Sequence, residues 1–232
     1  MSVIFECRDL VKSYGKVTAL KGISLQLESG RIVGLLGPNG SGKTTLIKLA
    51  NRLLQPTSGQ ILIDGNVPGV KTKAVIAYLP DKDYLPDWMK TSGLLDFFGD
   101  FYSDFDRQRA EEMLDSLDIP RDQSLKKMSK GTREKVQLIM TMSRRAKVYL
   151  LDEPIAGVDP AARDYILRTI IQNYDPEALV LISTHLIADV ESVLNEAVFL
   201  KKGEIVLHKS TDDIREETGK SVDEYFREVF RC

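Results

Sequence analysis

Apolar and polar residues along this chain follow two periods, one typical of strands and one typical of helices. Residues 23–27 alternate between apolar and polar positions, which predicts a half-buried strand. Two shorter apolar runs, residues 3–5 and 10–11, predict two short strands on either side of a polar break. Near-continuous apolar runs predict buried strands of a parallel sheet at residues 32–36, 148–153 and 178–183. Shorter runs predict further strands at residues 60–65, 74–79, 196–200 and 203–207, the last two forming a hairpin.

Between residues 81 and 147 the strand-like runs disappear and helical spacing replaces them. Ala110, Met113, Leu114 and Leu117 follow the i, i+3, i+4, i+7 pattern of an amphipathic helix. We therefore predict a helical lobe that is inserted between strands of the core. Further helices are expected directly after the turn at residues 37–45, from Leu46, and at residues 161–174.

The last segment of the chain predicts one more helix. Ser221 and Glu224 stand three residues apart, which is the spacing of a capping box at a helix N-terminus. Val222, Phe226 and Val229 then fall on one helical face. We expect this amphipathic helix to dock on the body of the protein rather than on a membrane, because its polar face carries charges of both signs.

An aromatic cluster stands inside the helical segment, and it comprises Phe97, Phe98, Phe101, Tyr102 and Phe105. Packing within the core of the lobe is the simplest interpretation. The alternative is a grooved surface that receives a helix of a partner protein.

The composition of the 232 residues is that of an ordinary globular protein, and the net charge of −2 argues against a dedicated nucleic-acid binder. Cys7 and Cys232 give neither a disulfide framework nor metal-ligand spacing, which fits a reducing cytoplasm. No apolar run approaches the ~20 residues needed to cross a bilayer, and the N-terminus does not resemble a signal peptide. Any role at a membrane is therefore expected to depend on a partner chain.

The strongest chemical signal is a glycine-rich turn between a predicted strand and a predicted helix. It consists of Gly37, Pro38, Asn39, Gly40, Ser41, Gly42, Lys43, Thr44 and Thr45. This is the phosphate-loop pattern, G-x-x-x-x-G-K-[ST]. Its backbone N–H groups and the helix N-terminus bind phosphates, its lysine reaches the β- and γ-phosphates, and its threonine hydroxyl ligates Mg²⁺. The turn therefore predicts a nucleoside triphosphate with Mg²⁺.

Two strand ends carry further candidate residues. Asp152 and Glu153 end a buried strand, and chemistry in open α/β sheets lies beyond such ends. Asp152 is a candidate Mg²⁺ ligand opposite Thr44, and Glu153 is a candidate for orienting or deprotonating a water molecule. His185 ends the next buried strand and is either a γ-phosphate contact or a polar residue satisfied within the fold.

The order of these features resembles the nucleotide-binding subunit of an ABC transporter over essentially the whole chain. Its most specific element is the segment Met128–Thr132, at the position where the family usually has Leu-Ser-Gly-Gly-Gln. The resemblance implies an α/β fold, a P-loop NTPase with a RecA-like core, an N-terminal antiparallel β subdomain and an inserted α-helical subdomain. The core and β subdomain would comprise residues 1–80 and 147–210, the helical subdomain residues 81–146, and a C-terminal helix residues 211–232.

The resemblance also implies an ATPase in which two subunits enclose two ATP molecules head to tail. Glu153 would be the general base and His185 a γ-phosphate contact, while Thr44, Asp81 and Asp152 would organise Mg²⁺. Nucleotide contacts would come from the phosphate loop, from Tyr14 and Val17 at the adenine, and from Ser129, Lys130, Gly131 and Asp159 across the dimer. Without the resemblance, Tyr14 would be interpreted as a packed turn residue.

The chain departs from the family pattern at two positions. Asp81 follows Tyr78-Leu79-Pro80 at the hinge, where the family usually has Gln, and a carboxylate cannot donate as an amide does. Lys130 replaces the first Gly of the signature segment, and our hypothesis is that its charge strengthens ATP-driven closure of the dimer. Residues 126–147 also contain eight basic residues and one acid, which we interpret as a solvated face rather than a nucleic-acid footprint.

The predicted function is ATP hydrolysis that powers transport through separate transmembrane subunits. The resemblance to small ABC-2-type exporter ATPases favours export of a peptide, an antibiotic or another amphipathic compound. The chain would sit at the cytoplasmic face of the membrane, as a homodimer or with a second ATP-binding subunit, and no nucleic acid is expected. The alternatives are a soluble ABC ATPase that acts on ribosomes or DNA, an ABC importer ATPase, and a module that binds ATP without hydrolysing it.

Overall fold

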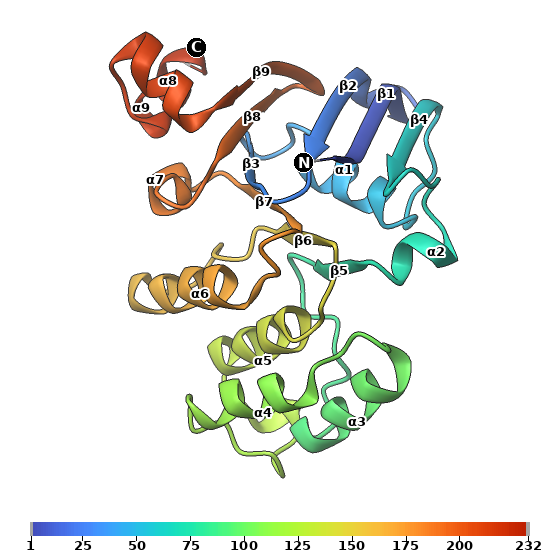
Figure 1. Ribbon diagram of the computed structural model, residues 1–232, viewed down its shortest axis with the longest axis vertical. Helices are drawn as coiled ribbons and strands as arrows, with labels where there is room; N and C mark the ends of the chain where they lie inside the picture. The colour runs from blue at the N-terminus through green and yellow to red at the C-terminus, as the bar shows by residue number, and fades with distance from the viewer. Residues whose placement is uncertain (1, 231–232) are drawn as a thin grey trace.

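The computed structural model describes residues 2–230, and within them six strands form the central sheet (Figure 1). Their order across the sheet is β5-β6-β7-β3-β8-β9. Their bounds are β3 Ile32–Leu36, β5 Ile76–Leu79, β6 Val148–Asp152, β7 Leu179–Thr184, β8 Glu196–Lys201 and β9 Glu204–Ser210. All pairs are parallel except the β8–β9 hairpin, so the predicted strands of a parallel sheet and the closing hairpin are confirmed.

The register of the parallel strands brings three strand ends to one edge of the sheet. Leu36 pairs with Thr184, and Asp152 pairs with Ser183. Every residue of β3, β6 and β7 is buried, which explains why these strands have no alternating polar positions. The turn after β3 and the carboxylates after β6 therefore emerge beside each other.

A second, antiparallel sheet has the order β2-β1-β4, with bounds β1 Val3–Tyr14, β2 Val17–Glu28 and β4 Ser58–Ile63. The prediction of two short strands before residue 12 is wrong, because β1 is continuous. Its polar break is a bulge at which Asp9 takes a φ of +45°, with register shifts between Cys7 and Leu10. The bulge interrupts the ladder without ending it, since Asp9 N–H donates to Ser24 Oγ at 3.0 Å.

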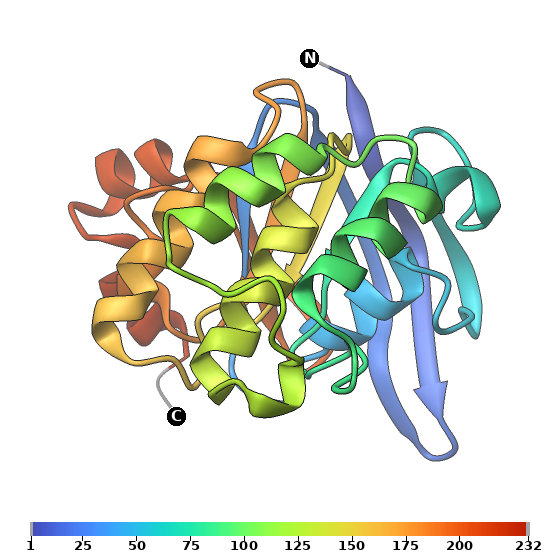
Figure 2. The same ribbon diagram turned by 90° about the horizontal axis from the view of Figure 1, so that it is seen from below.

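The segment in which a helical lobe was predicted contains α3 Thr91–Phe101, α4 Arg107–Asp115, a 3₁₀ turn η1 Leu125–Lys127 and α5 Lys130–Met142. Seen from below, its green helices lie in front of the strands (Figure 2). The lobe has a buried cluster of its own, in which Ala110, Met113 and Leu114 pack against Val136 and Ile139. The helical spacing of Ala110, Met113 and Leu114 therefore corresponds to a hydrophobic core within the lobe itself.

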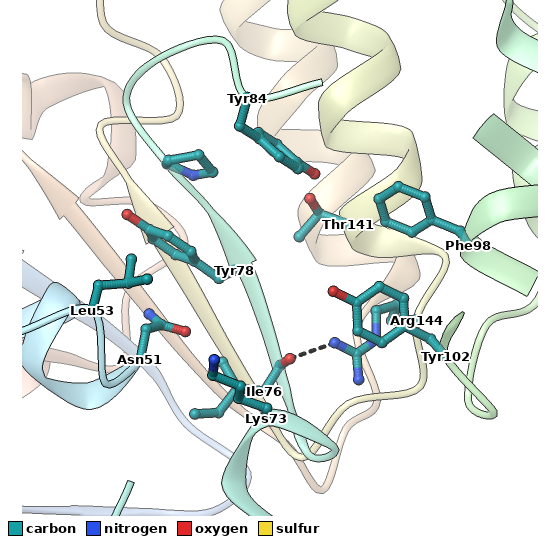
Figure 3. A pocket seen from close by; sticks show the side chains of 11 residues that line it. Asn51, Leu53, Lys73, Ile76, Tyr78, Tyr84, Phe98, Tyr102, Thr141 and Arg144 are labelled. Atoms are coloured by element: carbon teal, nitrogen blue, oxygen red, sulfur yellow. Dashed lines mark hydrogen bonds between the residues drawn. The ribbon is translucent and has the colours of Figure 1, made fainter. Parts of the chain in front are cut away.

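Arg144, directly after α5, connects this lobe to the central sheet. Its guanidinium donates to the carbonyls of Ile76 at 2.5 Å and Ala74 at 3.1 Å, and to the Asp104 carboxylate at 2.9 Å. It also lies over the Tyr102 ring, 3.9 Å from its centroid. Figure 3 shows Arg144, Tyr102 and Ile76 at the edge of the pocket between the central sheet and the helical lobe.

The other helices are α1 Lys43–Ala50, α2 Val70–Lys73, α6 Pro160–Asn173, α7 Ile187–Val190, α8 Thr211–Thr218 and α9 Val222–Val229. Helix α1 begins at Lys43, three residues before the predicted start. Helices α2 and α7 were not predicted, and the single C-terminal helix predicted at residues 211–232 is divided into α8 and α9 by Gly219, which takes a φ of +65°. The capping box of Ser221 and Glu224 is confirmed, since each backbone N–H donates to the other's side chain. In α9, Phe226 packs against Phe199 of β8, and residues 231–232 of the predicted C-terminal helix lie outside the described residues.

The aromatic cluster of the lobe divides into two groups. Phe98 is buried and lies against Tyr102 and Phe105. Phe97 and Phe101 are stacked on the outside of α3, with exposed fractions of 47% and 70%. Packing therefore accounts for only part of the cluster. Among residues 2–230, no helix is both long and apolar enough to cross a membrane.

Candidate functional site

The phosphate-loop turn has a backbone that only glycine accommodates at its tightest points. Gly42 takes a φ of +114°, and a Cβ there would lie 2.8 Å from the Ala19 carbonyl. A Cβ on Gly37 would lie 2.4 Å from the Leu200 carbonyl. Side chains at these positions would push the turn away from β2 and β8. The loop is thus held in one conformation between β3 and α1.

The open end of α1 faces this turn. Its N-cap is Gly42, no side chain caps it, and its first turn contains no acidic residue. The N–H groups of the first helical turn have no partner within a helix, and they carry its partial positive charge. Lys43 is almost fully buried and donates to the carbonyls of Gly37 at 2.7 Å and Pro38 at 3.3 Å. A phosphate in this turn would meet the backbone donors and the ammonium together.

Asp152 lies beside Thr44, as predicted. Thr44 Oγ1 donates to Asp152 Oδ1 at 3.1 Å, and Ser183 Oγ donates to the same oxygen at 2.6 Å. The second oxygen, Oδ2, is buried without a hydrogen-bond partner. Burial raises the pKa of the Asp152 carboxyl against the effect of these two hydrogen bonds, and the charges of Asp81 and Glu153 raise it further. A hydroxyl beside a carboxylate with an unpaired oxygen fits a small hard cation such as Mg²⁺.

Glu153 links the phosphate loop to His185. Its Oε1 lies 3.2 Å from Lys43 Nζ, and its Oε2 lies 3.0 Å from His185 Nδ1. Its backbone takes a φ of +51°, and its N–H donates to the carbonyl and the hydroxyl of Ser183. A non-glycine residue in this region is strained and persists only where its surroundings fix it. The strained turn directs the carboxylate towards the loop.

Asp81 follows Pro80 after β5, with its side chain exposed. Its charge raises the pKa of both Asp152 and Tyr78, so it acts on the same region. Within residues 2–230, no group of three or more His, Cys, Asp or Glu side chains is arranged to hold a metal ion by itself.

Tyr14 and Val17 are paired at the tip of the β1–β2 hairpin, and Tyr14 is 46% exposed. The hairpin adjoins the phosphate loop, because the Ala19 carbonyl of β2 abuts Gly42. Lys12 Nζ lies 5.2 Å from the centroid of the Tyr14 ring. Tyr14 is therefore a surface residue rather than a packed turn residue, and its ring is available for stacking.

Ser129, Lys130 and Gly131 stand at the N-terminus of α5 in the helical lobe. Ser129 is the N-cap, and its hydroxyl accepts from Thr132 N–H at 3.1 Å. A Cβ on Gly131 would meet open space. Lys130 is 68% exposed at its side chain and lies 3.6 Å from Glu134. Ser129 also bonds Thr132 through its hydroxyl at 2.8 Å, so the side-chain bonds given for Ser129 and Lys130 lie within α5.

Asp159 lies immediately before α6, and its carbonyl accepts from Arg163 N–H at 3.2 Å. The loop that precedes it borders a hollow of about 430 Å³, which Asp81, Lys130 and Glu153 also line. The predicted site residues thus form two groups. One surrounds the phosphate loop, and the other surrounds the N-terminus of α5.

Most of the basic residues between 126 and 147 have acidic partners. Arg144 pairs with Asp104, and four further pairs are Arg145–Asp106, Lys147–Asp64, Arg133–Asp83 and Lys130–Glu134. Paired cations on different sides of the lobe do not form a continuous basic face. The interpretation as a solvated surface is thus favoured over a nucleic-acid footprint.

Two contributors to the site escaped the sequence analysis. The Ser183 hydroxyl donates to Asp152 and accepts from the N–H of Glu153. Its position directly before Thr184 and His185, at the end of a predicted strand, could have indicated that it lies at the site. Gln137 is buried in α5 and binds the segment after Asp81, which no periodic pattern indicates.

A family model described as ABC transporter matches residues 20–156. The ABC transporter ATP-binding protein YtrB of Bacillus subtilis (strain 168) is 31% identical over 92% of the chain and 74% of its own length. The lipopolysaccharide export system ATP-binding protein LptB of Escherichia coli (strain K12) is 30% identical, with 97% of both chains covered. Two other curated relatives are longer, and the chain spans 58% and 62% of them.

Among solved structures, one described as the ATP-binding subunit of an ABC transporter is similar to the whole chain. Its TM-score is 0.88 at 27% sequence identity, and the match covers 98% of this chain and 100% of the other. The agreement extends over the central sheet, the β subdomain and the helical lobe together.

Proposed function

The chain belongs to the ABC transporter family of ATP-binding, ATP-hydrolysing domains, and on this basis we propose that it powers transport through separate transmembrane subunits. We propose export of a peptide, an antibiotic or another amphipathic compound. The name of LptB, an export-system protein of nearly the same length, supports export. The chain would then work at the cytoplasmic face of the membrane, bound to its partner. We also propose the division into a core with a β subdomain, a helical lobe and a C-terminal segment given above.

The observation that carries this proposal is the contact series from Lys43 through Glu153 to His185, beside the Thr44–Asp152 pair. In the proposed reaction, the loop amides and Lys43 bind the ATP phosphates, and Tyr14 and Val17 bind the adenine. Glu153 takes the proton of the attacking water, and His185 contacts the γ-phosphate. Thr44 and Asp152 would hold Mg²⁺, with Asp81 nearby, and the ion would neutralise charge on the transferred phosphoryl group.

The second group of site residues would act on the ATP of a partner subunit. Ser129 and Gly131 lie at the N-terminus of α5, in the helical lobe and not on the sheet that carries the phosphate loop. A head-to-tail dimer would set them against the γ-phosphate held by the other subunit, with Lys130 and Asp159 at the same junction. Closure would supply the positioning and the charge neutralisation that phosphoryl transfer requires.

The transmembrane partner would dock on the pocket between the sheet and the helical lobe (Figure 3). Leu53, Tyr78 and Phe98 line it, and its cavity volume is about 280 Å³. The exposed pair Phe97 and Phe101 stands on the same helix as Phe98. A hollow lined by apolar and aromatic side chains, with two exposed aromatics on one of its helices, suits the apolar face of a partner helix.

Steady-state ATP turnover of the wild type and of Glu153→Gln tests the catalytic assignment. Loss of the general base should lower turnover by roughly 10²- to 10⁴-fold while nucleotide binding persists. Glu177→Gln, which changes an exposed glutamate between α6 and β7, is the matched control and should keep wild-type turnover. Equal rates for Glu153→Gln and the wild type would contradict the assignment.

A further inference from the structure

The hinge that leads from β5 into the helical lobe is bound by side chains of α5. Asp83 Oδ1 accepts from Gln137 Nε2 at 2.7 Å, and Asp83 Oδ2 lies 3.3 Å from Arg133 Nε. Tyr84 N–H donates to Gln137 Oε1 at 3.3 Å. Both ends of one amide therefore engage two consecutive hinge residues. We call Asp83, Arg133 and Gln137 the polar clasp.

The surroundings of the polar clasp keep its hydrogen bonds in place. Gln137 is only 5% exposed, so its amide is shielded from water and depends on the hinge for its partners. Arg133 and Gln137 stand four positions apart and thus share one face of α5. Figure 3 shows Tyr84, the next hinge residue, directed towards Thr141 of the same helix. A buried amide that lost these partners would be left unsatisfied, which favours joint movement of the hinge and the helix.

The two ends of the clasp reach the two groups of site residues. At the hinge end, Asp81 is two residues from Asp83, and both line one hollow with Glu153, which directly follows Asp152. At the helix end, Arg133 Nη1 donates at 3.2 Å to the carbonyl of Met128, which directly precedes Ser129. The contacts of the clasp thus connect the hinge beside this hollow to the residue that precedes the N-terminus of α5.

We propose that the polar clasp couples the nucleotide end of the core to the signature segment, with Asp83 and Gln137 as positioning residues for hydrolysis. The proposal rests on the proposed function, because the signature segment must act on a partner's ATP. A shift of the hinge on nucleotide binding would then move Ser129 and Gly131 with it. Coupling of this kind requires contacts that survive the movement, and a buried amide with two hinge partners meets that requirement.

The test uses Gln137→Leu, which removes the amide at similar volume, Asp83→Ala, and the double variant. Each single change should lower turnover on the order of tenfold and weaken ATP-dependent dimerisation in a Glu153→Gln background. Nucleotide binding to the monomer should stay unchanged, because the phosphate loop is untouched, and this also shows that the variants fold. Asp87→Ala removes an acid that lines the same small hollow as Asp83 and Gln137, and should have no effect.

Non-additivity distinguishes coupling from two separate defects. The double variant should be no less active than the less active of the two single variants, since both changes break the contact between Asp83 and Gln137. Asp83→Asn keeps an acceptor for Gln137 and should recover most of the turnover lost in Asp83→Ala. Wild-type turnover and dimerisation in the single variants, or losses that multiply in the double variant, would overturn the proposal. A different result would contradict the proposed function: no ATP turnover by the wild type together with no ATP-dependent dimerisation of the Glu153→Gln variant.

Discussion

Glu153 holds its carboxylate between Lys43 and His185 from a strained backbone position. The ammonium of Lys43 is the group that a bound phosphate also requires. Arrival of ATP would therefore draw Lys43 from the carboxylate and leave Glu153 free to accept a proton. On this interpretation the contact series is a resting arrangement, in which the proposed base is held in an ion pair with Lys43 until substrate is present.

Lys130 is the residue at which the signature segment differs most from the family pattern. It stands at the first position of α5, and its nearest acidic partner, Glu134, is 3.6 Å away. The largely exposed side chain can thus turn towards a partner's phosphate. We expect Lys130→Gly to weaken ATP-dependent dimerisation of a Glu153→Gln background by roughly tenfold, because one favourable charge is lost across the interface. Sedimentation at several ATP concentrations measures this.

The salt dependence of dimerisation shows whether Lys130 acts through its charge or through the shape of its side chain. The difference between Lys130→Gly and its parent should shrink as the salt concentration rises, since screening weakens the lost attraction. Lys126→Gly, a change at an exposed lysine of the same basic run outside the signature segment, serves as the control. Unchanged dimerisation of Lys130→Gly at low salt would mean that Lys130 only faces solvent.

At the scale of elements, Arg144 determines how the helical lobe joins the sheet. The side chain is buried, and Arg144→Met would leave Asp104 and two carbonyls of the β5 region without their donor. We expect a loss of about 3 kcal/mol in the free energy of unfolding, because removal of one partner leaves a buried charge uncompensated. Urea unfolding followed by circular dichroism measures it.

The neighbouring arginine is a matched control for that change. Arg145 pairs with Asp106 at 2.8 Å, but its side chain is 67% exposed. Arg145→Met should therefore destabilise the protein far less than Arg144→Met, because an exposed ion pair is screened by water. Similar losses for the two variants would show that Arg144 is not the connection between lobe and sheet.

The elements also show how far the sequence predicts this fold. Strands β3, β6 and β7 were predicted because burial on both faces leaves a continuous apolar run. The phosphate loop was predicted because its tight turn and its phosphate contacts require glycines and a lysine within one short segment. Helices α2 and α7 are four residues long and lack a period of their own, and the break between α8 and α9 depends on the left-handed backbone of Gly219. The bulge in β1 depends on a partner strand, which no local pattern reveals.

Parts of the site were beyond prediction for the same reason. Asp83 and Gln137 are 54 residues apart, and each is an unremarkable polar residue in its own segment. Their importance comes from burial, which arises only when the lobe folds onto the hinge. Ser183 was similarly hidden, because its role depends on the register that pairs it with Asp152.

At the scale of the whole molecule, the site residues are divided between two lobes. Lys43, Thr44, Asp152 and Glu153 gather at the carboxyl edge of the central sheet, while Ser129 and Gly131 belong to the helical lobe. This division suits a site that is completed by a second subunit. An isolated chain should then bind nucleotide but hydrolyse it poorly.

Mixing two inactive variants tests the shared site directly. Lys43→Ala should spoil phosphate binding, and Ser129→Arg should block the signature segment, so neither chain alone should turn over ATP. In a mixed head-to-tail dimer, the intact phosphate loop of the Ser129→Arg chain faces the intact signature segment of the Lys43→Ala chain. Since half of randomly formed dimers are mixed and one of their two sites is intact, turnover should recover to roughly a quarter of the wild-type value. If both groups of residues acted within one chain, every site would carry a defect and mixing would restore nothing.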